Sequence, residues 1–171
     1  METVSILVDV QNIYYTTKQT FGRNFDYNEF WALATKNRKV VNASAYAIDR
    51  GDEKQKQFQN ILRAIGFEVK LKPFIQRADG SAKGDWDVGI TLDAMEYGQT
   101  SDTIILVTGD GDFDLLADRL RTKLNSSVEV YGVKKLTATS LIKSASLFIP
   151  IESKLLMNRI LPGKDNVGTA S

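Results

Sequence analysis

Two short apolar runs, each stopping abruptly at acidic residues, constrain most strongly what this chain can fold into. Residues 104–107 read Ile-Ile-Leu-Val and lead into Thr-Gly-Asp-Gly-Asp-Phe at 108–113, while residues 6–8 read Ile-Leu-Val and stop at Asp9. Continuous runs of branched apolar residues are typical of strands covered on both faces, as in a parallel sheet. Such sheets bind ligands beyond the carboxyl ends of their strands. The sequence therefore predicts carboxylates at the edge where a wound α/β fold keeps its site.

Strand-like and helix-like segments alternate along the chain. Strands are predicted at 4–9, 40–48, 67–71, 103–108 and 128–133, with a short edge strand at 147–151 because Pro150 disfavours a central position. Helices are predicted from apolar spacing at 13–18, 27–36, 52–65, 86–97, 112–124 and 137–144. This βαβα order predicts an α/β fold, a three-layer α/β/α sandwich with a mainly parallel central sheet and right-handed crossovers.

The length of 171 residues favours one domain. We expect it to span residues 1–152, followed over 153–171 by a C-terminal helix and a polar tail that frays. The helix at 86–97 is expected to turn Val88, Leu92 and Met95 toward the core.

The composition excludes several kinds of chemistry. The chain contains no Cys and no His, so it has no thiolate nucleophile, no Ser-His-Asp triad and no Cys- or His-ligated zinc. With 22 basic and 21 acidic residues, it also lacks a global field that would attract nucleic acid. We find no signal peptide and no apolar run of about 20 residues, so we expect a cytoplasmic protein without a membrane partner.

Acidic residues fall where the predicted strands end and the predicted helices begin. Asp9 ends the first strand, Asp110 and Asp112 follow the fourth, and Asp85 and Asp87 open the helix at 86–97. In a parallel sheet these points share one edge, and adjacent first and fourth strands would form its switch point. Like charges in one crevice raise each other's pKa unless a cation compensates. Oxygen ligands suit Mg²⁺ or Mn²⁺ better than zinc.

Each of these residues also has a purely structural interpretation. Asp112 or Asp85 could cap the helix that follows it, and Asp110 could stabilise its own turn. Asn12 could position a phosphate or a water, or it could cap a helix beginning at residue 13. Asp9 is the hardest to explain in this way, because it ends a buried apolar strand.

Basic and aromatic residues near the acids could hold a substrate. The basic candidates, which a solvated surface explains equally well, are Lys70, Lys72, Arg77 and Lys83. The candidates for base stacking, with core or edge packing as the alternative, are Trp86, Phe74 and Tyr14. Thr108 could donate to a ligand or simply end its strand. We assign Asn12, Lys83, Trp86 and Thr108 to substrate binding.

Three motifs occur together at the expected distances. Asp9 and Asn12 follow the first strand as Asp-x-x-Asn, residues 83–88 open the middle helix as Lys-Gly-x-x-Asp-Val, and Thr-Gly-Asp-Gly-Asp-Phe follows the fourth strand. Over about residues 3–150, this set resembles the NYN domain, in particular its LabA-like branch within the PIN-like nuclease superfamily.

The resemblance implies a PIN-like sandwich, a divalent-metal site and ribonuclease activity on RNA. By motif match, Asp9, Asp87, Asp110 and Asp112 correspond to the family's catalytic and metal-binding acids, with Mg²⁺ or Mn²⁺ as the cofactor. Many members have one residue between the Lys-Gly pair and the acid, whereas Asp85 and Trp86 both intervene here. We assign Asp87, rather than Asp85, to the metal.

Other functions remain open at this point. A non-catalytic regulator could keep the fold and bind RNA or a protein, and a homodimer is a further alternative. A haloacid-dehalogenase-type phosphatase needs a second Asp two residues after its nucleophile, where this chain has Gln11. A dinucleotide site has no support, because no G-x-G-x-x-G follows the first strand.

Overall fold

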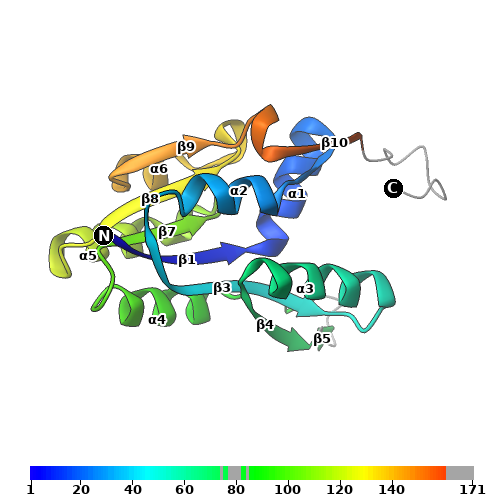
Figure 1. The fold of residues 1–171 in the computed structure, drawn as a ribbon, viewed down its shortest axis with the longest axis horizontal. Helices are drawn as coiled ribbons and strands as arrows, with labels where there is room; N and C mark the ends of the chain where they lie inside the picture. The colour runs from blue at the N-terminus through cyan, green and yellow to red at the C-terminus, as the bar shows by residue number, and fades with distance from the viewer. Residues whose placement is uncertain (74, 77–81, 84, 161–171) are drawn as a thin grey trace.

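A six-stranded parallel sheet forms the centre of the protein (Figure 1). The computed structural model describes residues 1–73, 75–76, 82–83 and 85–160. The strands lie in the order β4-β3-β1-β7-β8-β9. Their bounds are β1 (Thr3–Asp9), β3 (Lys39–Asp49), β4 (Glu68–Pro73), β7 (Thr103–Val107), β8 (Ser127–Gly132) and β9 (Leu147–Pro150). The order reverses at β1, so the switch point lies between β1 and β7, as the sequence predicts.

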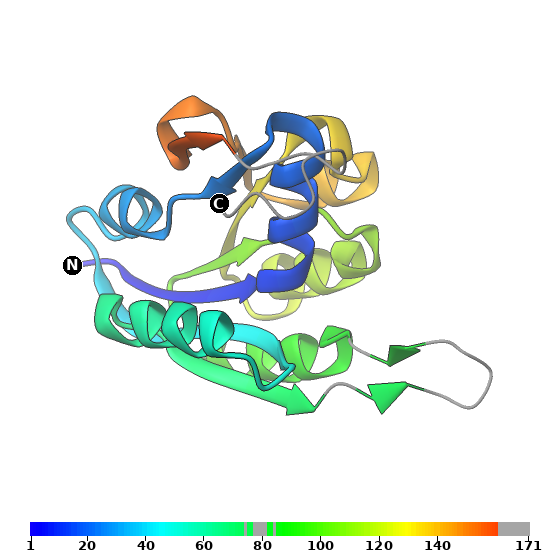
Figure 2. The ribbon, with the colours of Figure 1, turned by 90° about the vertical axis from the view of Figure 1, so that its right-hand side faces the viewer.

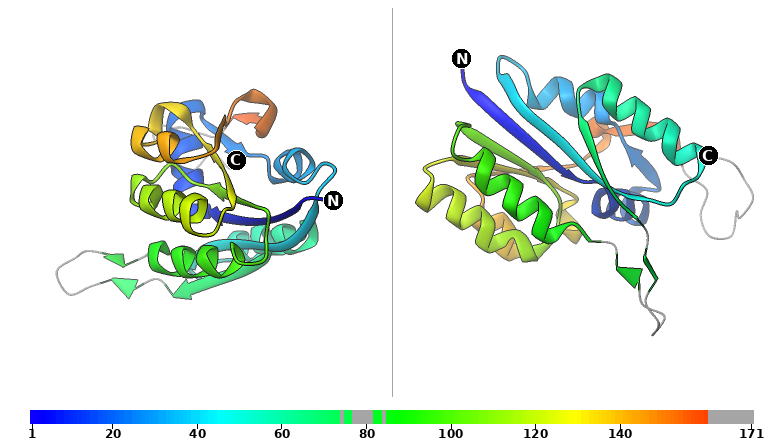
Figure 3. Two further views of the ribbon diagram at one scale, coloured as in Figure 1. Left: turned by 90° about the vertical axis from the view of Figure 1, so that its left-hand side faces the viewer. Right: turned by 90° about the horizontal axis from the view of Figure 1, so that it is seen from below.

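Helices cover both faces of the sheet and complete the predicted three-layer sandwich (Figures 1 and 3). One face carries α2 (Tyr27–Ala34) and α3 (Glu53–Ile65). The other carries α4 (Asp87–Tyr97), α5 (Asp114–Lys123) and α6 (Thr139–Ser144). Side chains of β1 alternate between the two cores, with Ile6 and Val8 in one and Leu7 in the other. Both faces of the strand are therefore buried, which explains its unbroken apolar sequence.

The first helix, α1 (Val10–Phe21), lies at the carboxyl edge of the sheet, and its Val10 and Ile13 are buried in the same core as Ile6 and Val8. Figure 2 faces this edge and shows α1 rising from the end of β1 toward the chain beyond β9. The helix is longer at both ends than the predicted 13–18, and it begins directly after Asp9. Gly22 ends it in the left-handed conformation, at φ 64°, which favours glycine.

Two small antiparallel pairs lie outside the main sheet. Strands β5 (Ile75–Gln76) and β6 (Ala82–Lys83) form an antiparallel pair between β4 and α4. Strands β2 (Arg23–Phe25) and β10 (Leu156–Ile160) form the other pair.

The predicted C-terminal helix is wrong for the described residues. Ser153–Leu155 form a single 3-10 turn, η3, and the chain then continues as β10. The open edge of β2 offers backbone partners, and Leu155 and Leu156 are buried in the core, so an extended chain satisfies both requirements. Residues 161–171 lie outside the described part of the chain, and the frayed tail stays a prediction.

The predicted inner face of α4 is wrong for Val88 and Leu92, whereas Met95 packs against the core as predicted. Val88 and Leu92 are 70% and 66% exposed, whereas Ile90 and Ala94 are buried. Both pairs have the i, i+4 spacing of one helix face, so spacing alone does not choose between them. The choice follows from Asp93, which accepts hydrogen bonds from Tyr46 and Lys70 of the sheet, each at 2.7 Å, and so sets the rotation of α4.

The predicted helix at 112–124 begins with a 3-10 turn, η1 (Gly111–Phe113), before α5 starts. Within the described residues, no helix combines the length and the apolar character needed to cross a bilayer.

Candidate metal centre

Three acidic side chains from distant parts of the sequence meet at the carboxyl edge of the sheet. Asp9 is the last residue of β1, Asp110 follows β7, and Asp87 is the first residue of α4. One carboxylate oxygen of each lies within 4.8 Å of one oxygen of each of the others. All three residues are half-buried. The adjacency of β1 and β7 places Asp9 opposite Asp110, and the start of α4 adds the third acid.

Hydrogen bonds from polar neighbours fix the loops that carry these acids. The hydroxyl of Thr108 donates to Asp9 Oδ2 at 3.1 Å and accepts from the backbone N–H of Asp110 at 3.2 Å. Asn12 Oδ1 accepts from the N–H of Gly109 at 2.9 Å. Thr108 and Asn12 therefore join the end of β1 to the loop after β7, and both lie beside the acids. Asn12 does not cap α1, because Asp9 does so by accepting from the Asn12 N–H at 3.4 Å.

Gly109 lets this loop approach a second segment closely. A Cβ atom at this position would lie 2.8 Å from the carbonyl oxygen of Leu136, closer than real Cβ atoms come to backbone. The N–H of Ala138 donates to the Gly109 carbonyl at 3.1 Å. The acidic loop is thereby held against residues 136–138, which follow β8.

Two further acids lie around this group without joining it. Asp112 is exposed and lies outside the set of three, and its N–H donates to Asp110 Oδ1 at 2.9 Å. Asp110, rather than Asp112, therefore caps the turn η1. Asp85 is also exposed, and its Oδ1 accepts from the Asp87 N–H at 3.2 Å. Of the two acids at the start of α4, Asp87 is the one that joins Asp9 and Asp110.

The group is electrostatically uncompensated. Burial raises the pKa of Asp9 to about 6, against the opposing hydrogen bonds from Asn12 and Thr108, and the charges of Asp110 and Asp85 raise it further. Burial also raises the pKa of Asp87 to about 6, with contributions from Asp110, Asp85, Asp9 and Asp112. Among the described residues, none of the three acids forms an ion pair with a basic side chain.

The acids at the opposite edge of the sheet, in contrast, have a basic partner. There Arg38 forms ion pairs with both Glu2 and Glu129. Carboxylate oxygens that are close together, half-buried and unpaired fit a hard divalent cation such as Mg²⁺ or Mn²⁺. The donor set therefore agrees with the predicted cofactor, although the geometry does not identify the ion.

Some of the residues expected to hold substrate have partners within the fold, some lie outside the described residues, and one is exposed. Lys70 is occupied by its ion pair with Asp93, at 2.7 Å. Trp86 packs into the fold, since its indole N–H donates to the Ala47 carbonyl at 2.8 Å and Lys72 Nζ lies 4.5 Å from its ring centroid. Phe74 and Arg77 lie outside the described residues, as does the side chain of Lys83. Tyr14 is exposed on α1.

Lys134 and Lys135 were not among the site residues predicted from the sequence. They follow β8 at the same edge as the acids, immediately before the segment that packs on Gly109. Two adjacent basic residues directly after a buried apolar strand were the available signal.

Comparison with known proteins agrees with this fold. The sequence is 25% identical over 156 residues to the low amplitude and bright protein LabA of Synechococcus elongatus, covering 86% of this chain and 83% of LabA. The crystal structure of a Vibrio parahaemolyticus protein of unknown function is 56% identical and superposes with a TM-score of 0.88, over 91% of this chain and 96% of that one. A family model described as the NYN domain matches residues 3–152. The predicted family is thus confirmed, and the chain belongs to the NYN domain family.

Proposed function

We propose that this protein is a metal-dependent ribonuclease that hydrolyses RNA phosphodiester bonds at the Asp9–Asp87–Asp110 group. The observation that carries the proposal is the approach of the three carboxylates to within 4.8 Å, without a basic partner among the described residues. Membership of the NYN family, within the PIN-like nuclease superfamily, supports the choice of reaction and of RNA as substrate.

Asp9, Asp87 and Asp110 would hold Mg²⁺ or Mn²⁺, and the exposed Asp112 would act through a water molecule. A bound cation would lower the pKa of a water molecule, so that the water loses its proton near neutral pH and becomes the nucleophile without a histidine, and it would offset charge on the phosphate oxygens. Thr108 keeps Asp9 and Asp110 in place, and Asn12 fixes the loop between them. Asn12, which is half-buried beside the acids, would also contact a substrate phosphate, whereas Thr108 is buried and would act only by holding the acids in place.

Cleavage of several unrelated RNAs in Mn²⁺ tests the proposal. We expect cleavage by the wild type and a loss on the order of 100-fold or more for Asp110→Asn, which keeps the turn cap but removes a ligand charge. Asp52→Asn is the matched control, because Asp52 caps α3 in a way that Asn can replace and does not belong to the acidic group.

Equal behaviour of the wild type and Asp110→Asn across all RNAs would overturn the enzyme proposal. A protein that bound RNA without cutting it would instead be the non-catalytic regulator. Hydrolysis of a small phosphate ester but not of RNA would indicate a phosphatase.

A further inference from the structure

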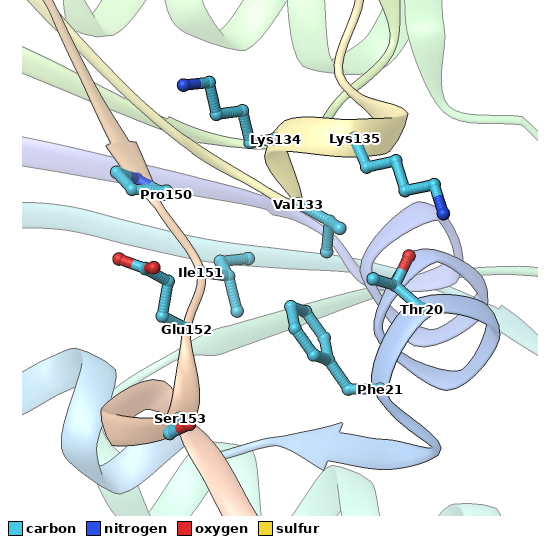
Figure 4. A pocket seen from close by; sticks show the side chains of 9 residues that line it. All are labelled: Thr20, Phe21, Val133, Lys134, Lys135, Pro150, Ile151, Glu152 and Ser153. Atoms are coloured by element: carbon cyan, nitrogen blue, oxygen red, sulfur yellow. The ribbon is translucent and has the colours of Figure 1, made fainter.

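A pocket opens at the carboxyl edge of the sheet, the edge that also carries the acidic group. Its volume is about 530 Å³. Thr20 and Phe21 from the end of α1 form one wall, Lys134 and Lys135 follow β8, and residues 150–153 comprise the last residue of β9 and the three that follow it (Figure 4). The pocket therefore lies at the carboxyl ends of β8 and β9, the two strands that follow β7 in the order of the sheet.

The pocket is joined to the acidic group by two continuous pieces of structure. The segment after β8 carries the lysines and then packs against Gly109, directly before Asp110. Helix α1 begins directly after its cap Asp9 and reaches the pocket at Thr20. Asn12 and Thr20 share a face of this helix because they are two i, i+4 steps apart. At 1.5 Å per residue, these two positions are about 12 Å apart along the axis, a distance that a few linked nucleotides can span.

The two lysines are available to a ligand. Both are exposed, and neither forms an ion pair within the part of the chain that the structure describes. Lys70, in contrast, is paired with Asp93, and Lys72 covers Trp86. In Figure 4 the ammonium groups of Lys134 and Lys135 point in different directions, so they would contact different phosphates of one strand.

The remaining walls suit the less polar parts of a nucleotide. Phe21 is 38% exposed at the pocket and offers a ring on which a base can stack, next to the apolar side chain of Ile151. The acid among the lining residues, Glu152, points away from Lys135 in Figure 4. The side near Lys135 and Thr20 therefore combines a cation, a hydroxyl and an aromatic ring.

We infer that this pocket binds the backbone of the RNA strand that is cut at the acidic group, with Lys134 and Lys135 contacting phosphates and Phe21 contacting a base. The inference rests on the proposed ribonuclease function. It also answers a problem of that function, because three acids repel a phosphate backbone and the strand must be held by cations elsewhere along the same edge. An acidic protein segment explains the lysines but gives the exposed ring no role.

The experiment compares two pairs of lysines. RNA binding is measured by fluorescence anisotropy with a labelled single-stranded 12-mer in Mn²⁺, using Asp110→Asn as the background so that the RNA stays intact. Lys134→Gln/Lys135→Gln should weaken binding on the order of 10-fold at 50 mM salt and reduce the salt-dependence slope by about 1.4, or 0.7 per lost contact. Lys36→Gln/Lys39→Gln removes the same charge from exposed positions where β3 begins, at the opposite edge, and should change neither value.

Cleavage by the enzyme with an intact acidic group provides a second measurement. The Lys134→Gln/Lys135→Gln change should raise KM about 10-fold, because backbone grip is lost, and leave kcat nearly unchanged. Thermal unfolding should be unaltered, since both side chains are exposed and unpaired.

The outcomes separate this inference from the proposed function. If the wild type cuts RNA but the two lysine pairs behave alike, the pocket inference alone is overturned. If no RNA is cut but the pocket lysines still control binding, the pocket inference is supported and the nuclease proposal fails. If the wild type neither cuts nor binds RNA, both fail. Displacement of RNA from the pocket by a polyglutamate peptide at similar concentration would overturn the choice of RNA.

Discussion

At the scale of single residues, the acids lie where their ionised forms lower the stability of the fold. Asp9 ends a strand buried on both faces, and Asp87 opens a helix that faces it. A protein without a use for these charges would be more stable with neutral residues there, because burial and mutual repulsion penalise the ionised forms. The cost is visible in the pKa values of Asp9 and Asp87, both raised to about 6.

This cost predicts how stability depends on pH in EDTA. The pKa of Asp9 is raised from 3.8 to about 6 in the folded state, so the folded protein binds this proton more tightly than the unfolded chain does. The stability that the proton contributes is complete below pH 3.8 and is lost as the pH rises through 6. Asp9→Asn keeps an N-cap and removes this titration, so we expect it to increase the free energy of unfolding by about 1–3 kcal/mol at pH 7. The difference from the wild type should vanish near pH 4.

Urea unfolding at pH 4, 5, 6 and 7 measures this difference. Asp52→Asn is the control, because Asp52 caps α3 and does not belong to the acidic group. A variant Asp9→Asn that was less stable than the wild type by the same amount at every pH would contradict the argument.

At the scale of elements, the sequence predicts what local patterns and strand edges determine. The six main strands follow from their apolar runs, and the convergence of Asp9 with Asp110 follows from the adjacency of β1 and β7. The rotation of α4 could not be predicted, because it depends on Asp93 reaching Tyr46 and Lys70, which are distant in sequence. Strand β10 was missed for the same reason, since its partner β2 lies more than a hundred residues earlier.

Trp86 tests how α4 is positioned. Its N–H bond to Ala47 attaches the start of the helix to β3, directly before Asp87. Trp86→Phe leaves that carbonyl without its partner, at a cost of about 1–3 kcal/mol, which corresponds to a fall in Tm of about 2–10 °C. We also expect Mn²⁺ affinity to fall on the order of 10-fold, as is typical when the support of a metal ligand is removed.

RNA affinity at saturating Mn²⁺ should stay close to that of the wild type if Trp86 only positions the helix. The control is Trp31→Phe, because Trp31 packs against Phe67 in the other core and has no contact with the acids. Calorimetry gives the Mn²⁺ affinity and anisotropy gives the RNA affinity. Weaker RNA binding with unchanged Mn²⁺ affinity would instead show that Trp86 stacks a base, as the sequence predicts.

At the scale of the whole molecule, the two edges of the sheet differ in whether their acids have basic partners. The amino edge neutralises Glu2 and Glu129 with Arg38, so those charges stabilise the fold directly. The carboxyl edge keeps three acids without basic partners among the described residues and places exposed lysines nearby, on the segment after β8. The first edge is complete without a ligand, whereas the second becomes electrostatically balanced only when a cation binds.

This asymmetry predicts that a divalent cation stabilises the whole fold. A ligand that binds only the folded state at 100 times its Kd adds about 2.7 kcal/mol, which for a chain of this size is a rise in Tm of about 5–10 °C. We expect that rise with Mn²⁺ at pH 8 and a much smaller one at pH 5.5, because below a pKa of about 6 Asp9 and Asp87 must release protons to bind. Asp110→Asn should lose most of the effect and Asp52→Asn should keep it, as followed by circular dichroism during heating. Equal rises in Asp110→Asn and the wild type would show that Mn²⁺ binds somewhere other than this group.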